Sequence, residues 1–373
     1  MQQTSFDIPP QLFLEESNLY INQRSIYTLN TKDGAISQIY PSAGQLSIAT
    51  DAFYLNVNRF SDSSVQAIRK KDGSVLWSYK TNGRLIQSPI IYKESIYICT
   101  AEGEIYALLV QDGTLQWHIS ITRDSNIPSF QGPIILTPPL VISDVLYVTS
   151  MVNSPTQTHL YAFRVNDGTL LWQTPVPEAN SSSFITSNKR FYLPMANGYL
   201  SLNTNDGAIL WQKRLERMAH FLSQPVVSDT NIYVCLSEFR DDLLALESGR
   251  HAVLQQSVIY ALETTKGNVL WKRIYRNIQQ TTLPVSLSAI GEHICIGTYD
   301  GEIIAYEKNS GKHLWDIKVS EYPLSLLGGS DNIIYASDSK GNVIALRETD
   351  RTVLWQSFIN STPITRTGFL RQL

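Results

Sequence analysis

The sequence predicts an all-β fold, an eight-bladed β-propeller made of four-stranded antiparallel blades, for three reasons. A short motif, Asp-Gly, two residues and then Leu-Trp, recurs with small changes along the 373 residues. Most copies are about 40 residues apart, the size of one propeller blade. Strand-like segments flank every copy. The motif holds all seven tryptophans of the chain, namely Trp77, Trp117, Trp172, Trp211, Trp271, Trp315 and Trp355.

The motif predicts a tight turn followed by the outermost strand of a blade. Its tryptophan copies read KDGSVLW, QDGTLQW, NDGTLLW, NDGAILW, TKGNVLW, NSGKHLW and TDRTVLW. Glycine, aspartate and asparagine tolerate the positive φ that tight hairpins require. An eighth, eroded copy, KDGAISQ, has Gln38 where the tryptophan would stand, which gives eight repeats.

The segments around the motif supply the other three strands of each blade. A strand such as EIYALL precedes it, and an apolar run, a polar turn and a second strand follow it, as in SPIIYKESIYICT. Their β-branched and aromatic residues favour strands. We expect a single domain, residues 1–373, with blades at about 11–39, 45–80, 87–119, 136–176, 183–214, 224–275, 283–319 and 324–359.

We interpret the tryptophans as structural residues that dock neighbouring blades. In the outermost strand the large ring can fill the wedge between two blades, which widens away from the axis. Truncating such a buried aromatic typically costs roughly 3–5 kcal/mol. The aspartates of the motif have an equally structural explanation, because they are typical turn residues.

The two ends of the chain bear on closure of the predicted ring. The first blade looks complete from Gln11, and the tail, residues 360–373, contains Thr362-Pro363-Ile364, which resembles the start of an innermost strand. We expect the tail either to pair with N-terminal residues or to pack outside the ring.

The repeats resemble the pyrroloquinoline-quinone (PQQ)-like repeat family, in which a Tyr-Ala-Leu strand, a glycine turn and Leu-Trp follow one another. The copies IYALLVQDGTLQW, LYAFRVNDGTLLW and IYALETTKGNVLW carry the resemblance, which extends over residues 11–359. It implies a quinoprotein-type propeller. The family includes quinone-dependent alcohol dehydrogenases and the BamB-type lipoprotein of outer-membrane barrel assembly.

Within that family the chain looks closer to the non-enzymatic, BamB-like branch. The dehydrogenases are longer, carry two adjacent cysteines near the cofactor, and hold calcium with Glu, Asn and Asp; no such cysteine pair or calcium set can be assigned here. We therefore expect no catalytic residues, no cofactor and no metal. The resemblance favours an extracytoplasmic location, periplasmic or at the cell surface, although MQQTSFDIPP shows no signal peptide or lipoprotein cysteine.

Motifs for other chemistry do not stand out. There is no phosphate-binding loop, no G-x-S-x-G elbow and no G-x-G-x-x-G, and the six histidines do not follow a zinc-site pattern. Cys99, Cys235 and Cys295 are interpreted as buried free thiols. The net charge of −3 gives no general attraction to nucleic acid. No apolar run reaches the roughly 18 residues of a membrane helix.

Blade topology predicts where a partner binds. In a four-stranded meander the second-to-third loop and the connection to the next blade emerge on the same face. The long segments fall into these two classes, and long loops on a rigid scaffold usually carry binding. These segments are 119–138, 150–158, 215–223 and 236–256. The candidate contact residues are Arg123, Asp124, Phe130, His220, Phe239, Arg240, Asp241 and Arg250.

Segment 236–256 is expected to form a short amphipathic helix before Gly249, because apolar residues alternate with charges there. Two roles stay open for it: a docking element for a partner, or a cap that covers the end of its own blade.

The leading hypothesis is a non-catalytic, monomeric scaffold that binds a protein or peptide through this face, as a BamB-like protein would. One alternative is a sensor module that binds a small molecule or glycan in the channel mouth. A PQQ-dependent dehydrogenase is a further alternative.

Overall fold

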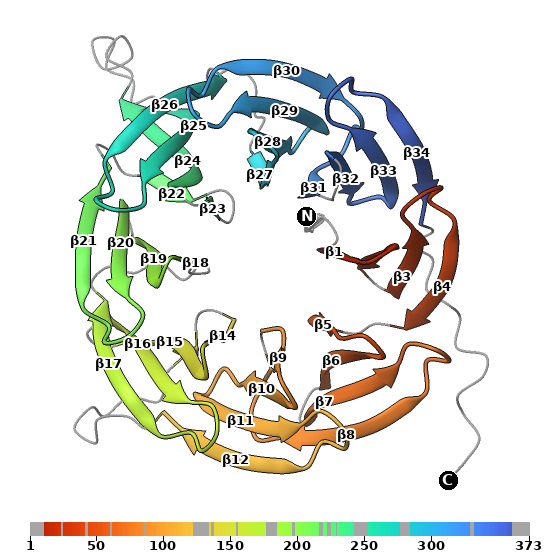
Figure 1. The fold of residues 1–373 in the computed structure, drawn as a ribbon, viewed down its shortest axis with the longest axis vertical. Helices are drawn as coiled ribbons and strands as arrows, with labels where there is room; N and C mark the ends of the chain where they lie inside the picture. The colour runs from red at the N-terminus through yellow and green to blue at the C-terminus, as the bar shows by residue number, and fades with distance from the viewer. Residues whose placement is uncertain are drawn as a thin grey trace. The chain divides into compact units, whose positions relative to one another are not determined.

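The computed structural model is all-β and contains eight antiparallel sheets (Figure 1). Each sheet is a meander of strands that follow one another in the chain, and the sheets are the blades of an eight-bladed β-propeller, so the predicted fold class is confirmed. The structure describes residues 11–23, 25–41, 44–59, 62–85, 87–121, 134–135, 138–153, 156–176, 185–195, 198–215, 219–221, 225–228, 230–241, 253–276, 284–328 and 332–359. The tail, residues 360–373, for which either pairing with N-terminal residues or packing outside the ring was expected, lies outside them.

The chain divides into two compact units. Unit 1 comprises residues 1–42, 221–262 and 269–373, and unit 2 comprises residues 43–220 and 263–268. Blades 1, 7 and 8 belong to unit 1 and blades 2 to 5 to unit 2. Blade 6 belongs to unit 1 apart from its third-to-fourth turn and the first two residues of β22.

Blade 1 contains β1 (Gln11–Glu15), β2 (Asn18–Asn22), β3 (Ser25–Asn30) and β4 (Ile36–Pro41). Blade 6 contains β22 (Ala219–Phe221), β23 (Val226–Val227), β24 (Asn231–Asp241), β25 (Val253–Glu263) and β26 (Val269–Arg276). Blade 7 contains β27 (Pro284–Ile290), β28 (His293–Thr298), β29 (Glu302–Glu307) and β30 (His313–Lys318), and blade 8 contains β31 (Leu324–Gly328), β32 (Ile333–Asp338), β33 (Asn342–Arg347) and β34 (Val353–Phe358).

Blade 2 contains β5 (Leu46–Ile48), β6 (Ala52–Arg59), β7 (Asp62–Arg69) and β8 (Val75–Thr81), and blade 3 contains β9 (Ile90–Tyr92), β10 (Ser95–Cys99), β11 (Glu104–Leu109) and β12 (Leu115–Ser120). Blade 4 contains β13 (Ile134–Ile135), β14 (Leu140–Ile142), β15 (Val145–Asn153), β16 (Thr156–Arg164) and β17 (Leu170–Val176). Blade 5 contains β18 (Ile185–Ser187), β19 (Arg190–Met195), β20 (Gly198–Asn203) and β21 (Ile209–Arg214).

The motif turn between the third and fourth strands is held by its aspartate. In blade 3 the Asp112 carboxylate accepts a hydrogen bond of 2.9 Å from the backbone N–H of Thr114. Gly113 between them has a φ of +73°, which glycine adopts without steric penalty. The aspartate and glycine of the motif are therefore explained by the turn, as predicted from the sequence.

A β-bulge recurs directly after this turn in every blade. In blade 2, Ala67 lies opposite Trp77, whereas Ile68 lies opposite Val75, which leaves Leu76 without a cross-strand partner. The bulge turns the tryptophan inward and leaves the two apolar residues before it exposed. The same shift follows Thr28, Ala67, Ala107, Ala162, Ser201, Ala261, Ala305 and Ala345.

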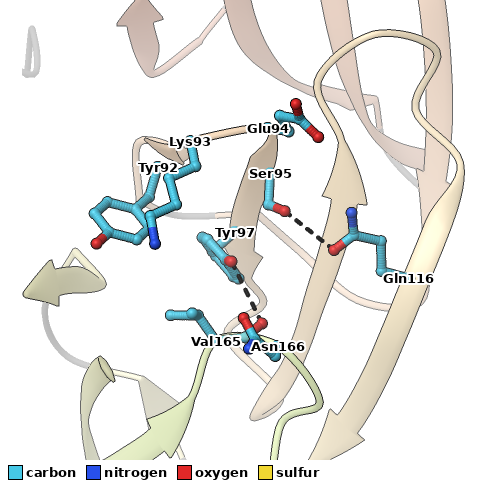
Figure 2. A pocket seen from close by; sticks show the side chains of 8 residues that line it. All are labelled: Tyr92, Lys93, Glu94, Ser95, Tyr97, Gln116, Val165 and Asn166. Carbon is cyan, nitrogen blue, oxygen red and sulfur yellow. Dashed lines mark hydrogen bonds between the residues drawn. The ribbon is translucent and has the colours of Figure 1, made fainter. Parts of the chain in front are cut away.

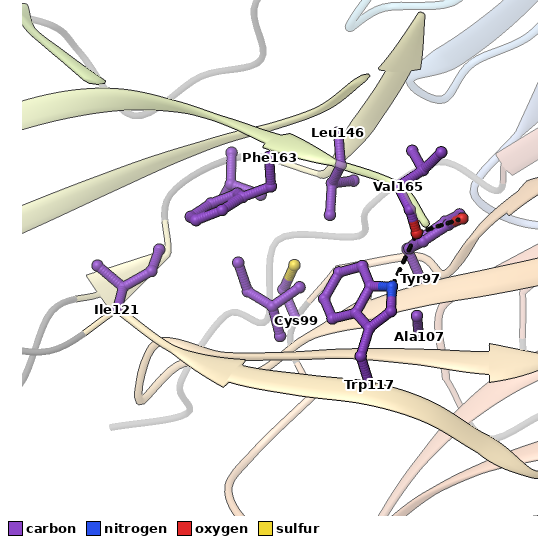
Figure 3. Packing of buried hydrophobic residues seen from close by; sticks show 10 residues of the cluster. Tyr97, Cys99, Ala107, Trp117, Ile121, Leu146, Phe163 and Val165 are labelled. Atoms are coloured by element: carbon purple, nitrogen blue, oxygen red, sulfur yellow. Dashed lines mark hydrogen bonds between the residues drawn. The ribbon is translucent and has the colours of Figure 1, made fainter. Parts of the chain in front are cut away.

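Trp117 of blade 3 shows the contact that joins one blade to the next (Figure 3). Its Nε1–H donates to the carbonyl of Val165 in blade 4 over 2.7 Å, and the Tyr97 hydroxyl donates to the same carbonyl over 3.4 Å. The two rings are tilted by 41° with centroids 5.8 Å apart. The indole thus makes an apolar and a polar contact at once.

A glycine of the next blade makes room for the indole of every tryptophan except Trp315. A Cβ atom added to Gly168 would lie 2.9 Å from Cε3 of Trp117, closer than real Cβ contacts allow. The bond from the indole to the next blade also recurs, at 2.7 to 3.1 Å. Its further donor and acceptor pairs are Trp77 and Val110, Trp211 and Thr264, Trp271 and Lys308, and Trp355 and Thr31.

Apolar clusters fill the space between facing blades. In the cluster of Figure 3, Tyr97, Cys99 and Trp117 of blade 3 pack against Leu146 and Phe163 of blade 4. Blades 8 and 1 pack in the same way around Trp355, within unit 1. The core therefore consists of layers between blades, which explains why one aromatic per repeat recurs.

The three cysteines are free and buried, as the sequence analysis expected. Burial raises the pKa of the Cys99, Cys235 and Cys295 thiols, in the last two to about 12. These thiols are therefore protonated at neutral pH and act as small apolar side chains.

Two positions depart from the pattern. Gln38 replaces the tryptophan in β4 and accepts a hydrogen bond from the Tyr40 hydroxyl. Arg351 replaces the turn glycine in blade 8 and has a φ of +62°. Its backbone N–H still donates to the Arg347 carbonyl over 2.9 Å, as the glycine does in the other turns, so the turn is kept at the cost of strain.

We predict that Arg351→Gly raises the free energy of unfolding by about 1 kcal/mol, because glycine removes the strain of the left-handed backbone. Gly113→Ala should lower it, since its Cβ would lie 2.6 Å from Cε3 of Trp77. Arg351→Lys is the matched control and should leave it unchanged. Thermal unfolding followed by circular dichroism measures all three, and an Arg351→Gly variant less stable than the parent contradicts this account.

The motif aspartates predict acid sensitivity. Hydrogen bonds from the residue two positions later lower the pKa of four carboxyl groups, and that of Asp72 to about 2. Because each folded pKa lies below the unfolded value of about 3.9, the carboxylates stabilise the fold above about pH 4, and this is lost as the pH falls toward 2. The four residues are Asp72, Asp112, Asp167 and Asp350.

Replacing all four by asparagine keeps the turn acceptor and removes the titration. Stability should then depend less on pH between 4 and 2, as measured by urea unfolding at each pH. Asp316→Asn, on an outer strand away from these turns, serves as the control. If the loss of stability between pH 4 and 2 is the same in the fourfold variant as in the parent protein, the turns are not the source of that loss.

Candidate interaction site

The second and third strands differ in length from blade to blade. They have eight residues each in blade 2 (β6 and β7), nine in blade 4 (β15 and β16) and eleven in blade 6 (β24 and β25). In the other blades they have five or six residues. Each of these three second-to-third hairpins is therefore longer than those of the other blades, and we call them the projecting hairpins.

The projecting hairpins of blades 4 and 6 are reinforced by extra short strands. In blade 4, β13 pairs with the distal part of β15 through Ile134 with Met151 and Ile135 with Ser150, while β14 pairs with its proximal part. In blade 6, β22 and β23 both belong to the sheet beside β24. Each hairpin therefore stands on a broadened sheet.

These strands correct the prediction that the long segments are loops. Most of 150–158 forms the ends of β15 and β16, and 236–241 and 253–256 continue β24 and β25. The connections 119–138 and 215–223 contribute β13 and β22. Backbone pairing between neighbouring strands, which single-segment patterns do not reveal, outweighed the polar composition. Residues 242–252, where the helix was expected, lie outside the described residues.

The predicted contact residues fall into two groups. Phe239, Arg240 and Asp241 end β24, and His220 lies in β22, the neighbour of β24 in the sheet of blade 6. The other four lie outside the described residues; they are Arg123, Asp124, Phe130 and Arg250.

The base of the blade 4 hairpin carries two buried polar atoms without a partner. Ser150 and His159 lie opposite each other in β15 and β16, and the Ser150 hydroxyl and the His159 Nδ1 make no hydrogen bond. Burial lowers the pKa of His159, so its imidazole is neutral at neutral pH. Sequence analysis did not single out either residue, because their pairing depends on the strand register.

A cavity of about 560 Å³ lies at the opposite end of the blades, between blades 3 and 4 (Figure 2). The Ser95 hydroxyl donates to the Gln116 side chain over 3.0 Å at its wall. Lys93 lies over the Tyr92 ring and pairs with Asp144 of blade 4, 2.5 Å away. The lining residues are Tyr92, Lys93, Glu94, Ser95, Tyr97, Gln116, Val165 and Asn166.

The residues for bond-making chemistry are sparse. In the described part of the chain, no three His, Cys, Asp or Glu side chains gather in a way that could hold a metal ion. His293 and Cys295 stand two apart on β28, a spacing that the sequence analysis overlooked, and Glu348 of blade 8 approaches the imidazole to 2.5 Å. Among the described residues, there is no helix that is long and apolar enough to cross a bilayer.

Comparison with known proteins shows which family has this architecture and a similar sequence. A family model described as outer membrane protein assembly factor BamB matches residues 13–153, 129–254 and 255–372. The BamB of Yersinia pestis is 22% identical over 310 residues, which are 80% of this chain and 71% of that protein. The BamB of Shewanella oneidensis is 21% identical over 277 residues, covering 69% of this chain and 60% of that protein.

Solved structures agree on the fold. The crystal structure of BamB from Moraxella catarrhalis is 17% identical, with a TM-score of 0.59 and 85% of each chain covered. A quinohemoprotein alcohol dehydrogenase from Pseudomonas putida HK5 is 12% identical, with a TM-score of 0.64 over 91% of this chain and 70% of that one. The dehydrogenase shares only the architecture, whereas the family model follows the sequence through nearly all the repeats. The chain therefore belongs to the family of outer membrane protein assembly factor BamB.

Proposed function

We propose that this protein is a non-catalytic scaffold for outer-membrane protein assembly, in which the lengthened hairpin of blade 4 and that of blade 6 each offer a docking element for a partner protein. The observation that carries the proposal is the lengthening of β15 and β16 and of β24 and β25 in an otherwise regular repeat. Regular blades serve the fold, and extra residues that are ordered into a broadened sheet serve a purpose outside it.

The geometry suits a protein partner better than a substrate. Hairpins on a rigid sheet present a preformed surface, so little conformational entropy is lost on binding. Phe239 and Arg240 are residue types favoured at the centres of interfaces. The names of the relatives support a role in outer-membrane assembly, and with it an extracytoplasmic location.

The cavity between blades 3 and 4 supports a second candidate, the binding of a small polar molecule such as a sugar. Two tyrosines, amide and hydroxyl groups, and the charged Lys93 and Glu94 line it, a composition that suits a polyhydroxylated ligand. It lies at the other end of blade 4 from the second-to-third hairpin, so the two candidates predict different contact residues.

Site-specific photo-crosslinking tests the proposal. A photo-reactive amino acid at Phe239 or Arg240 should form a covalent adduct with an envelope protein in living cells, because these positions lie on the proposed docking hairpin. The same amino acid at Lys71, in the short turn at the other end of blade 2, is the matched control and should form none. The adduct is identified by mass spectrometry.

A second variant tests the role of the hairpin tip. Replacing residues 242–252 by a short Gly-Ser linker between Asp241 and Val253 keeps β24 and β25 and removes the segment between them. Recovery of the crosslinked partner should fall by at least about tenfold if several contact residues are lost. Adducts from Lys71 but not from blade 6, or unchanged recovery with the linker, would refute docking at this site.

A further inference from the structure

The interface between blades 7 and 8, within unit 1, departs from the pattern of the other blade interfaces. In blades 2 to 6 a second-strand tyrosine donates its hydroxyl to the carbonyl that follows the third strand of the next blade, as Tyr233 does to Lys308 over 3.3 Å. In blade 7, β28 has Cys295 at the tyrosine position, opposite Ala305. In blade 8 the turn glycine is Arg351. Two of the docking residues are therefore missing at one interface.

Glu348 stands at the receiving position of this interface. Its counterparts in the other blades offer only a backbone carbonyl, but Glu348 is 3% exposed and carries a carboxylate into the interface. The Nδ1 of His293 lies 2.5 Å from its Oε1, although the angles do not make a hydrogen bond. A buried carboxylate costs stability unless a positive charge accompanies it.

The equivalent position in blade 5 supports a tethering role for His293. Arg190 also begins a second strand, and its guanidinium donates to the carbonyls of Thr264 and Thr265 in the following turn. The first residue of the second strand can thus reach the next blade. His293 makes the corresponding contact, with an imidazole in place of the guanidinium.

We infer that His293 and Glu348 form a protonation-dependent latch between blades 7 and 8. With the imidazole protonated, the buried carboxylate has its counter-charge and the interface is closed. When the imidazole loses its proton, the carboxylate loses that partner and this interface opens more readily than its neighbours, because no tyrosine bridge holds it.

The other charged groups at this place are few. The Lys308 ammonium donates to the Gly291 carbonyl, and it lies near enough to the Cys295 thiol to act on its pKa together with Glu348. Glu292 and Arg351 stand in the turns on either side. Lysine and arginine keep their charge between pH 6 and 8.5, whereas histidine is the basic residue type whose charge changes in that range.

Cysteine labelling measures directly how readily the interface between blades 7 and 8 opens. Cys295 lies in the blade 7–8 interface, whereas Cys235 lies in the adjacent interface, which has its tyrosine and its glycine. Brief alkylation followed by mass spectrometry gives the labelling of each thiol, and the ratio of Cys295 to Cys235 cancels the common effect of pH on thiol reactivity. The ratio should exceed one and rise about fivefold from pH 6 to 8.5.

Two variants and a control complete the test. Glu348→Gln should abolish the pH dependence of the ratio, and His293→Gln should fix it at the value of the parent protein at pH 8.5. His313→Gln, an exposed histidine of the same blade that pairs with Asp316, should behave as the parent protein does. Low labelling of Cys99 verifies that each variant is folded.

The inference is overturned by a parent ratio that stays constant with pH, or by a pH dependence that survives Glu348→Gln. Because the pH series on the parent protein needs no substitution, a variant that fails to fold does not prevent the decision. The partner-binding proposal is independent of this result, since it concerns blades 4 and 6.

Discussion

The contact between an indole and the turn of the next blade is the interaction on which the rest of this structure depends. One side chain fills the wedge between two sheets, donates a hydrogen bond to a carbonyl of the neighbour, and in six of the seven cases packs against a glycine of that neighbour. The bulge between the third and fourth strands turns the indole into this position. Motif, turn and bulge thus form one device, repeated with each blade.

This device leaves the other end of the blades free to vary. The tryptophan contacts lie at the outer strands and the third-to-fourth turns, so the second-to-third hairpins can lengthen without disturbing them. Blades 4 and 6 use this freedom, and their extra strands β13 and β22 stiffen what would otherwise be loops. In a family named for outer-membrane assembly, hairpins stiffened in this way are a suitable means of holding another protein.

The sequence predicts the elements that recur in the blades, but it does not predict the features that occur in single blades. The tryptophans, the turn glycines and the eight sheets follow from a motif whose residue types have one physical use. The strand ends beyond Ser150 and Leu236 were taken for loops, because their pairing depends on the register with distant residues. Ser150 and His159 became neighbours only through that register. Neither Cys295 nor Glu348 is conspicuous in the sequence by itself. Their importance follows from comparison with the tyrosine and the carbonyl that occupy the same positions in other blades.

The most direct measurement is hydrogen exchange at the indole nitrogens of the native protein, observed by NMR after tryptophan labelling with ¹⁵N. Five indole N–H groups are bonded to the next blade: those of Trp77, Trp117, Trp211, Trp271 and Trp355. If docking holds the blades together, these protons exchange only when an interface opens, orders of magnitude more slowly than in free tryptophan. Exchange at the rate of a free indole in the folded protein would contradict the account.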